Sequence, residues 1–362
     1  MKPLTKHLLL GTRKGLVVCT LTSSGWKIKA THFIGIPVSI AFADQRTNTW
    51  WACLDHGHWG CKIHRSTDMG VNWKEITAPQ YPEGATIKED VPATLRYIWA
   101  MSDGGSSHPN KLWLGSEPGG LFESNDSGDS FQFVQGLWDH PSRKDHWFGA
   151  GRDYAGIHSI VVDPRDNDHI FVGLSVAGVF ETTDGGKTWE GRNKGLKAEY
   201  LPDHDAAYGH DPHILVACPT APDVMWQQNH CGIFKTTDGA KSWQDVSDTN
   251  KLANFGFAIA VDHDNPNQAW VVPGDSDEIR VAVDGALCVC RTDDGGKTWT
   301  DYRAGLPQEN CFDIVYRHSL DVWGDWVVFG TTTGNVFISG DRGETWDTLS
   351  NYLPMIYAVS FC

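Results

Sequence analysis

The chain has 362 residues, of which 40% are hydrophobic and 21% charged, and its formal net charge is −15. This acidic excess repels phosphate backbones and anionic lipid headgroups, so nucleic acid and membrane surfaces are not expected as main partners. A neutral ligand, or a ligand bound by a local cluster of charges, is more compatible with this acidic net charge.

The N-terminal region contains an apolar run that Arg13 and Lys14 interrupt. A secretory signal needs an unbroken apolar core, and a transmembrane helix needs about 20 apolar residues, so the sequence predicts neither. The nine cysteines are odd in number, and four of them lie in apolar, strand-like contexts, which fits free thiols in a reducing compartment: Cys53, Cys218, Cys311 and Cys362. We therefore expect a cytoplasmic protein.

One short phrase recurs six times along the chain, at 66–73, 124–131, 182–189, 236–243, 292–299 and 339–346. Each copy starts with Ser or Thr, has a central aspartate and ends with Trp or Phe. The central aspartates are 47 to 58 residues apart, which is the spacing of a blade-like repeat. A degenerate seventh copy, at 23–26, keeps the glycine and the tryptophan.

The phrase has the chemistry of a tight turn between two strands. The aspartate accepts backbone N–H bonds across the turn, and glycine supplies a positive φ. The closing aromatic, Trp189 in the third copy, is expected to pack into the core and anchor the turn to its own blade.

These residues resemble the Asp-box, or BNR repeat, of sialidases and several unrelated propellers. The resemblance implies an all-β fold, a seven-bladed β-propeller. Seven four-stranded blades of roughly 50 residues need about the length of this chain, so residues 1–362 are predicted to form one domain.

Within one repeat we predict four strands, A to D, at 157–163, 170–174, 179–182 and 189–192. The segment 8–19 is predicted to form strands B and C of an incomplete blade, and 355–361 an orphan strand A. The two ends should therefore pair and close the ring, which removes exposed sheet edges.

Because successive strands reverse direction, the B–C and D–A loops share one face, where ligand sites around the channel are expected. Three consecutive intervals on this face are long, at 73–97, 131–158 and 189–213, whereas those at 243–257 and 299–313 are short. The long loops should build a wall over one side of the channel mouth.

Nine of the sixteen histidines gather in the predicted loops of this face or at strand entries: His56, His58, His140, His146, His158, His204, His210, His213 and His230. Imidazoles that converge from several blades can bind a divalent metal or act as acid and base. We predict a divalent metal held by His58, His158, His213 and His230, the last three also being catalytic. The alternative is that these histidines are solvated or tie loops together.

Four carboxylates are candidate general acids or bases: Asp55, Glu117, Asp205 and Asp211. Of these we predict Asp211 and Glu117 to be catalytic, although a turn role is equally open for Glu117. Three arginines on the same face could clamp an anion, with loop-tethering salt bridges as the alternative. The full set of predicted substrate contacts is Arg13, His56, Trp59, Arg143, Trp147, Arg152, Tyr208 and Asn229. For the tryptophans, stacking on a sugar competes with burial in the core.

Beyond the turns, the phrases at 11–16, 55–60, 136–143, 156–160, 208–213 and 227–232 resemble a bacterial group of BNR-repeat glycosyl hydrolases, or sialidase-like proteins. The resemblance implies a hydrolase or lyase for a carbohydrate-like or small polar substrate. Sialidase activity itself is not expected, because the Arg-Ile-Pro phrase is absent and no Tyr/Glu pair is identifiable by motif. The alternative is a non-enzymatic scaffold for a protein partner, as in some Asp-box propellers of photosystem assembly and sorting receptors.

Overall fold

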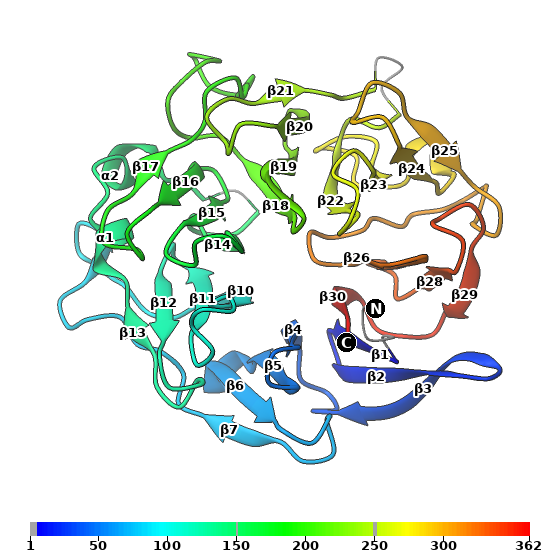
Figure 1. The fold of residues 1–362 in the computed structure, drawn as a ribbon, viewed down its shortest axis with the longest axis horizontal. Coiled ribbons are helices and arrows are strands. Elements are labelled where there is room, and N and C mark those ends of the chain that lie inside the picture. The colour runs from blue at the N-terminus through cyan, green and yellow to red at the C-terminus, as the bar shows by residue number, and fades with distance from the viewer. Residues whose placement is uncertain (1–5, 150, 249–251) are drawn as a thin grey trace.

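The computed structural model describes residues 6–149, 151–248 and 252–362. Over these residues the chain forms seven four-stranded antiparallel sheets, arranged as blades around a central channel (Figure 1). The predicted seven-bladed β-propeller is confirmed.

Each blade runs from an inner strand at the channel to an outer strand at the rim. The inner strands are β4 (Val38–Asp44), β10 (Tyr97–Asp103), β14 (Ile157–Val162), β18 (Pro212–Cys218), β22 (Gly256–Val261), β26 (Leu320–Trp323) and β30 (Ile356–Phe361). The second strands are β5 (Thr49–Asp55), β11 (Leu112–Glu117), β15 (Ile170–Leu174), β19 (Ala221–Asn229), β23 (Ala269–Pro273), β27 (Trp326–Gly330) and β1 (His7–Thr12).

The third and outer strands complete the blades in the same order. The third strands are β6 (Cys61–Ser66), β12 (Leu121–Ser124), β16 (Gly178–Thr182), β20 (Gly232–Thr236), β24 (Val289–Thr292), β28 (Val336–Ser339) and β2 (Gly15–Thr22). The outer strands are β7 (Lys74–Ile76), β13 (Gln132–Phe133), β17 (Glu190–Gly191), β21 (Gln244–Asp245), β25 (Thr300–Tyr302), β29 (Asp347–Ser350) and β3 (Gly25–His32).

The core lies between neighbouring blades. Strands β15 and β16 are buried at every residue, because the blades on either side cover both of their faces. This explains their continuous apolar runs, which do not alternate with polar residues. The outer strand β17 has an exposed and a half-buried residue, as expected at the rim.

The two ends of the chain share one blade, as predicted. Strand β30 pairs with β1 in antiparallel register, with Leu9 opposite Ser360, and the order in this blade is β3-β2-β1-β30. The degenerate seventh copy lies at the turn between β2 and β3, and its Trp26 is buried.

The repeated turns have the predicted hydrogen bonds. In the copy at 182–189, Asp184 accepts the backbone N–H of Thr188 at 2.9 Å, and the Thr182 hydroxyl accepts the N–H of Gly186 at 3.0 Å. Gly186 has a φ of 95°, which favours glycine. The aspartates of the other copies accept the equivalent backbone N–H: Asp68, Asp126, Asp238, Asp294 and Asp341.

The closing tryptophans do more than anchor their own blade. The indole N–H of Trp243 donates to the Arg192 carbonyl at 2.8 Å, and that of Trp299 donates to the Val246 carbonyl at 2.8 Å. Both carbonyls belong to the preceding blade. The prediction of an anchor confined to one blade was therefore too narrow, since two turns also fasten their blade to its neighbour.

The three long loops are confirmed, and two of them contain small elements outside the blades. The hairpin β8 (Thr86–Lys88) and β9 (Val91–Pro92) precedes β10, and the helices α1 (Gln135–Trp138) and α2 (Arg143–His146) precede β14. The expectation of a short interval ending at residue 313 was wrong, because the chain enters the channel without regular pairing there and β26 begins only at residue 320.

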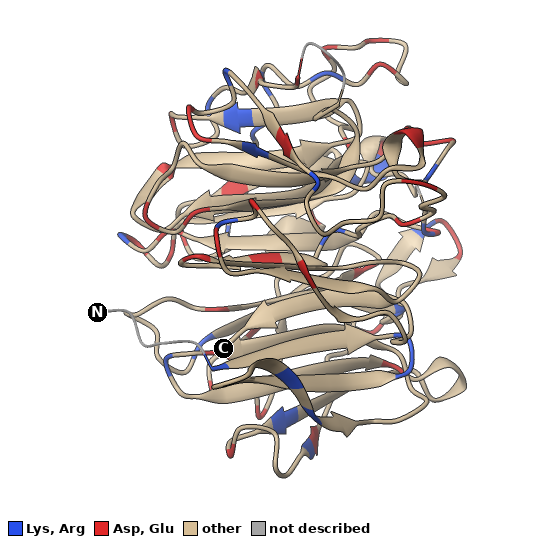
Figure 2. Cartoon of the chain, turned by 90° about the vertical axis from the view of Figure 1, so that its right-hand side faces the viewer, with Lys and Arg blue, Asp and Glu red and all other residues tan. Residues whose placement is uncertain are grey.

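Two further elements are short 3-10 turns in B–C loops, η1 (Gly57–Trp59) and η2 (Val283–Gly285). The nine cysteines are free thiols, as expected. In the part of the chain that the structure describes, no helix has the length and apolar character to span a bilayer. Acidic and basic positions occur together on strands and on loops at both ends of the blades (Figure 2).

Replacing Asp184 by alanine should lower the free energy of unfolding by about 1–3 kcal/mol, because the backbone N–H groups of the turn lose their acceptor. Urea denaturation measures this change. The control is Asp347→Ala on the exposed start of β29, expected to change stability by less than about 0.5 kcal/mol. Equal stability of both variants would contradict the structural role of the turn.

Acid should weaken the turns over a defined pH range. The hydroxyl of Thr188, followed by its backbone N–H, lowers the pKa of Asp184 to about 2 in the folded protein. In the unfolded chain this pKa returns to about 3.9, so the stabilisation is complete above that value and disappears as the pH falls toward about 2. The stability difference between the native protein and Asp184→Asn should therefore narrow below about pH 4. A constant difference down to about pH 2 would rule out this linkage.

Candidate functional site

A cavity of about 310 Å³ lies at the mouth of the channel, where the inner strands begin. Six aromatic side chains line it: Tyr97, Trp99, Phe255, Phe257, Tyr316 and Tyr357. Its charged and titratable lining comprises Arg152, Asp211, His213, His230, Asp277, Arg280, Arg317 and His318. The cavity is on the B–C and D–A face, where the sequence predicts ligand sites.

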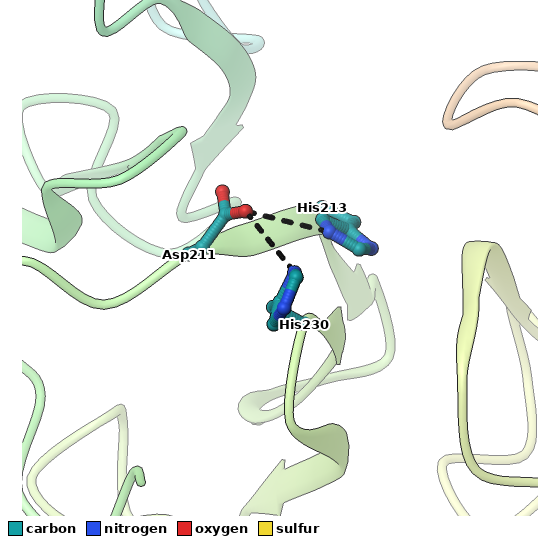
Figure 3. A group of neighbouring side chains, drawn as sticks. All are labelled: Asp211, His213 and His230. Atoms are coloured by element: carbon teal, nitrogen blue, oxygen red, sulfur yellow. Dashed lines mark ion pairs between the residues drawn. The ribbon is translucent and has the colours of Figure 1, made fainter. Parts of the chain in front are cut away.

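Three of these side chains converge in one blade (Figure 3). Asp211 immediately precedes β18, His213 is the second residue of that strand, and His230 follows β19, which pairs with β18. The Oδ2 atom of Asp211 lies 3.5 Å from Nε2 of His213 and 3.7 Å from Nδ1 of His230. The three atoms that could bind a metal all lie within 4.8 Å of one another. Strand pairing thus brings together residues almost 20 positions apart.

Each of these three side chains has a further contact on the side away from the group. The Nδ1 atom of His213 lies 2.6 Å from the carbonyl oxygen of Gly256, and Nε2 of His230 lies 3.4 Å from the carboxylate of Asp277. The Oδ1 atom of Asp211 accepts the backbone N–H of Val176 at 3.1 Å. These contacts fix the orientation of both rings and of the carboxylate.

The local electrostatics favour an ionised carboxylate beside a neutral imidazole. Burial alone would raise the pKa of Asp211, but His213, Arg317 and His230 bring it down to about 2. For His213, burial lowers the pKa and outweighs the attraction of Asp211. At neutral pH Asp211 is therefore a proton acceptor with a neutral ring next to it.

Arg317 is a cavity residue that the sequence reasoning missed. Its guanidinium lies over the rings of Trp99 and Phe257, at 5.0 and 5.5 Å, and its Nε has no hydrogen-bond partner among the described residues. Burial lowers its pKa, the charge of Asp211 opposes this shift, and Arg280, which lies over the same phenylalanine ring, adds like-charge repulsion. An anionic or oxygen-rich ligand group would supply the partner that this guanidinium lacks.

Two of the four predicted metal-binding histidines lie outside the group. His58 is exposed in η1, with its ring 5.3 Å from that of Trp59. His158 is fully buried in β14, and its Nδ1 lies 2.8 Å from the Ser159 hydroxyl. The predicted set of His58, His158, His213 and His230 is therefore not brought together, and Asp211, predicted only as catalytic, lies beside the remaining two.

Glu117 was predicted to be catalytic, but it is not among the residues that line the cavity. It is 2% exposed, accepts a hydrogen bond from Nε of Arg152, and is 3.3 Å from the backbone N–H of Tyr154. Arg152 lines the cavity and lies 4.0 Å from the centre of the Tyr97 ring. This placement favours a role for Glu117 in holding Arg152 and the loop that carries it.

Three predicted substrate contacts are occupied within the long loops instead. Arg143 donates to the Trp138 carbonyl at 2.6 Å, so it tethers its own loop, as in the alternative stated for the arginines. Trp147 is buried and its indole donates to the Ser142 hydroxyl, so it packs in the core and does not offer a face to a sugar. Tyr208 is half-buried, and its ring stacks against that of Phe180.

The remaining predicted contacts are divided between the rim and the turns. Trp59 is 70% exposed, and Arg13 is exposed with its backbone N–H bonded to Met355. The backbone N–H of His56 bonds to the carbonyl of Gly60. Asn229 is buried, and its side chain accepts the N–H of Cys231, which shapes the turn that carries His230.

A scan against models of known protein families finds no match for this chain. Among curated proteins, the chain is 34% identical over 83 residues to a probable oligoxyloglucan-reducing end-specific xyloglucanase of Neosartorya fischeri, covering 23% of this chain and 9% of that protein. It is 26% identical over 310 residues to the xyloglucanase Xgh74A of Acetivibrio thermocellus, covering 78% of this chain and 33% of that protein. The chain thus spans a third or less of the length of these relatives.

Solved structures share the fold at low sequence identity. An ancestral GH74 enzyme superposes on 96% of this chain, and on 40% of its own, with a TM-score of 0.60 at 15% identity. YCF48 bound to D1 peptide superposes on 94% of this chain, and on 88% of its own, with a TM-score of 0.50 at 15% identity. These likenesses concern the propeller fold alone.

Replacing Glu117 by glutamine should lower the free energy of unfolding by about 1–3 kcal/mol, because the Arg152 guanidinium loses its charged partner beside the cavity. The matched control is Asp153→Asn, which removes an exposed partner of Arg96 and should cost less than about 1 kcal/mol. Both values follow from urea denaturation. A Glu117 variant as stable as the native protein would leave this structural assignment without support.

Proposed function

We propose that the chain is a hydrolase or lyase that acts on a carbohydrate-like or other small polar substrate in the channel-mouth cavity. The observation that carries the proposal is the group of Asp211, His213 and His230 in a cavity that also contains Arg317. The similarity to xyloglucanases over 78% of the chain supports a carbohydrate as the substrate class.

The cavity supplies both kinds of contact that a sugar needs. Its volume of about 310 Å³ is at the lower end of the range for small-ligand pockets, which suits a short ligand or one end of a longer one. Aromatic rings such as Trp99 and Phe257 offer faces to the C–H groups of a sugar ring. Arg317 and the histidines offer polar atoms to its hydroxyl or carboxylate groups.

The proposed chemistry is general acid and base catalysis. Asp211 is ionised and only 7% exposed, so it can accept a proton from a substrate group or a water molecule. His230 lies between Asp211 and Asp277, and the latter is 48% exposed at the rim. A proton taken up at the buried carboxylate can therefore pass through the imidazole toward solvent.

Three finer assignments belong to the same proposal. The six repeated turns are proposed to be Asp-box (BNR) repeats, on the evidence of their shared residues and hydrogen bonds. The propeller is proposed to be a single domain. A cytoplasmic location is proposed from the residue composition.

A scaffold for a protein partner is the second candidate. Among the large apolar side chains in the loops of the same face, the most exposed, at 70% or more, are Ile34, Trp59, Phe312 and Tyr352. They would offer a peptide an apolar rim around the mouth. The fold is shared with YCF48, which has been solved bound to D1 peptide.

The activity can be tested with a panel of neutral xyloglucan oligosaccharides and uronate-containing oligosaccharides, analysed for cleavage products. For any substrate found, Asp211→Asn should lower kcat/KM at least about 100-fold, because the proposed base is lost. The control is Asp347→Asn, on the exposed start of β29, which should retain full activity.

An Asp211 variant with native activity would exclude the proposed mechanism. Absence of cleavage across the panel, together with peptide binding that Trp59→Ala abolishes, would favour the scaffold instead.

A further inference from the structure

We propose that Asp211, His213 and His230 bind one divalent transition-metal ion at the channel mouth. The ligand set differs from the four histidines expected from the sequence. The proposal deepens the proposed function and rests on it only for the catalytic use of the ion. The ion's binding stands on the arrangement of the three side chains and can be tested separately.

The contacts behind the two rings indicate which nitrogen of each ring carries the proton. A neutral imidazole has one nitrogen that donates and one that accepts. The Gly256 carbonyl can only accept, so Nδ1 of His213, 2.6 Å away, carries the proton and Nε2 presents a lone pair. For His230 we place the proton on Nε2, which lies 3.4 Å from the Asp277 carboxylate, so that Nδ1 has the lone pair.

Both lone pairs face the same carboxylate oxygen. The Oδ2 atom of Asp211 lies 3.5 Å from Nε2 of His213 and 3.7 Å from Nδ1 of His230. Three electron-rich atoms in this position repel one another unless a cation or additional protons lie between them. One cation between them would satisfy all three atoms at once, including that of His213, whose side chain is only 2% exposed.

The distances fit a metal shell. Zinc binds imidazole nitrogen and carboxylate oxygen at about 2.0–2.2 Å, which places neighbouring ligands of a tetrahedral ion about 3.4 Å apart. The two carboxylate–imidazole distances are within a few tenths of an ångström of that value, and all three ligand atoms lie within 4.8 Å. Side-chain rotations that bring the most distant ligand atoms, which lie within 4.8 Å of each other, to about 3.4 Å would complete the shell.

The contacts behind the ligands have the pattern found around protein metals. Metal-binding histidines generally donate their other N–H to a backbone carbonyl or a carboxylate, which fixes the ring and raises its basicity. His213 has the first kind of partner, Gly256, and His230 has the second, Asp277. A group that merely tied loops together would not require both rings to be oriented with their lone pairs inward.

The ligand types also restrict the metal. Two imidazoles and one carboxylate suit zinc and neighbouring transition metals, whereas calcium and magnesium prefer oxygen alone. All three side chains line the cavity, so the remaining coordination positions face the place where a substrate would bind. A bound ion would polarise a substrate oxygen or a water molecule there, and Asp211 and His230 would then act as its ligands instead of as base and proton relay.

The test uses the whole chain without a histidine tag, stripped with EDTA and titrated with Zn²⁺ by calorimetry, with mass spectrometry for metal content. We expect one Zn²⁺ per chain. Asp211→Asn and His213→Gln should each weaken Zn²⁺ binding by more than about 100-fold, and Asp277→Asn by about 10- to 100-fold. The control, His58→Gln, removes a histidine of the same face and should bind Zn²⁺ like the native protein.

Circular dichroism and thermal melting establish that each variant is folded. If His213→Gln fails to fold, the visible absorption of Co²⁺ in the native protein and its change in Asp277→Asn provide the same test. The metal site is excluded if the native protein does not bind Zn²⁺, or if Asp211→Asn binds Zn²⁺ as tightly as the native protein.

The metal site and the proposed function can fail independently. If the protein cleaves a substrate after EDTA treatment and binds no Zn²⁺, the proposed function stands and the metal site is excluded. If the native protein binds Zn²⁺, the ligand variants do not, and no substrate is cleaved, the metal site stands and the proposed function is excluded.

Discussion

The pairing of β30 with β1 is the constraint on which the rest of this structure depends. It joins the two ends of the chain within one blade and closes the ring. In a closed ring each blade is packed on both faces, so the inner strands have fixed distances across the channel. The position of Arg317 relative to Asp211, which come from different blades, follows from that closure.

Rigidity at the channel mouth has a second source in the repeated turns on the opposite face. Trp243 and Trp299 donate from their indoles to carbonyls that follow the outer strands of the preceding blade, so two turns link neighbouring blades near the rim. The cavity therefore lies in a ring whose neighbouring blades are fastened at the rim. This arrangement allows long loops and polar side chains at the mouth without loss of the core.

Local chemistry explains how much of the fold could be predicted from the sequence. The turn residues act within eight positions, so Asp184 and Gly186 identify their turn without knowledge of the rest of the chain. The site depends instead on contacts between distant segments. Asp211 and His213 are two residues apart at a strand entry, a spacing that favours one side of an extended chain, whereas the position of His230 beside them requires the pairing of β18 with β19.

Arg317 could not be found in this way, because it lies in a segment without regular strand pairing.

The shared blade also affects synthesis on the ribosome. Strands β1 to β3 are made first, yet their inner neighbour, β30, is made last. The first blade must therefore wait, with one edge uncovered, while more than 320 residues are translated. Its apolar strands are then the part of the nascent chain most in need of protection by a chaperone.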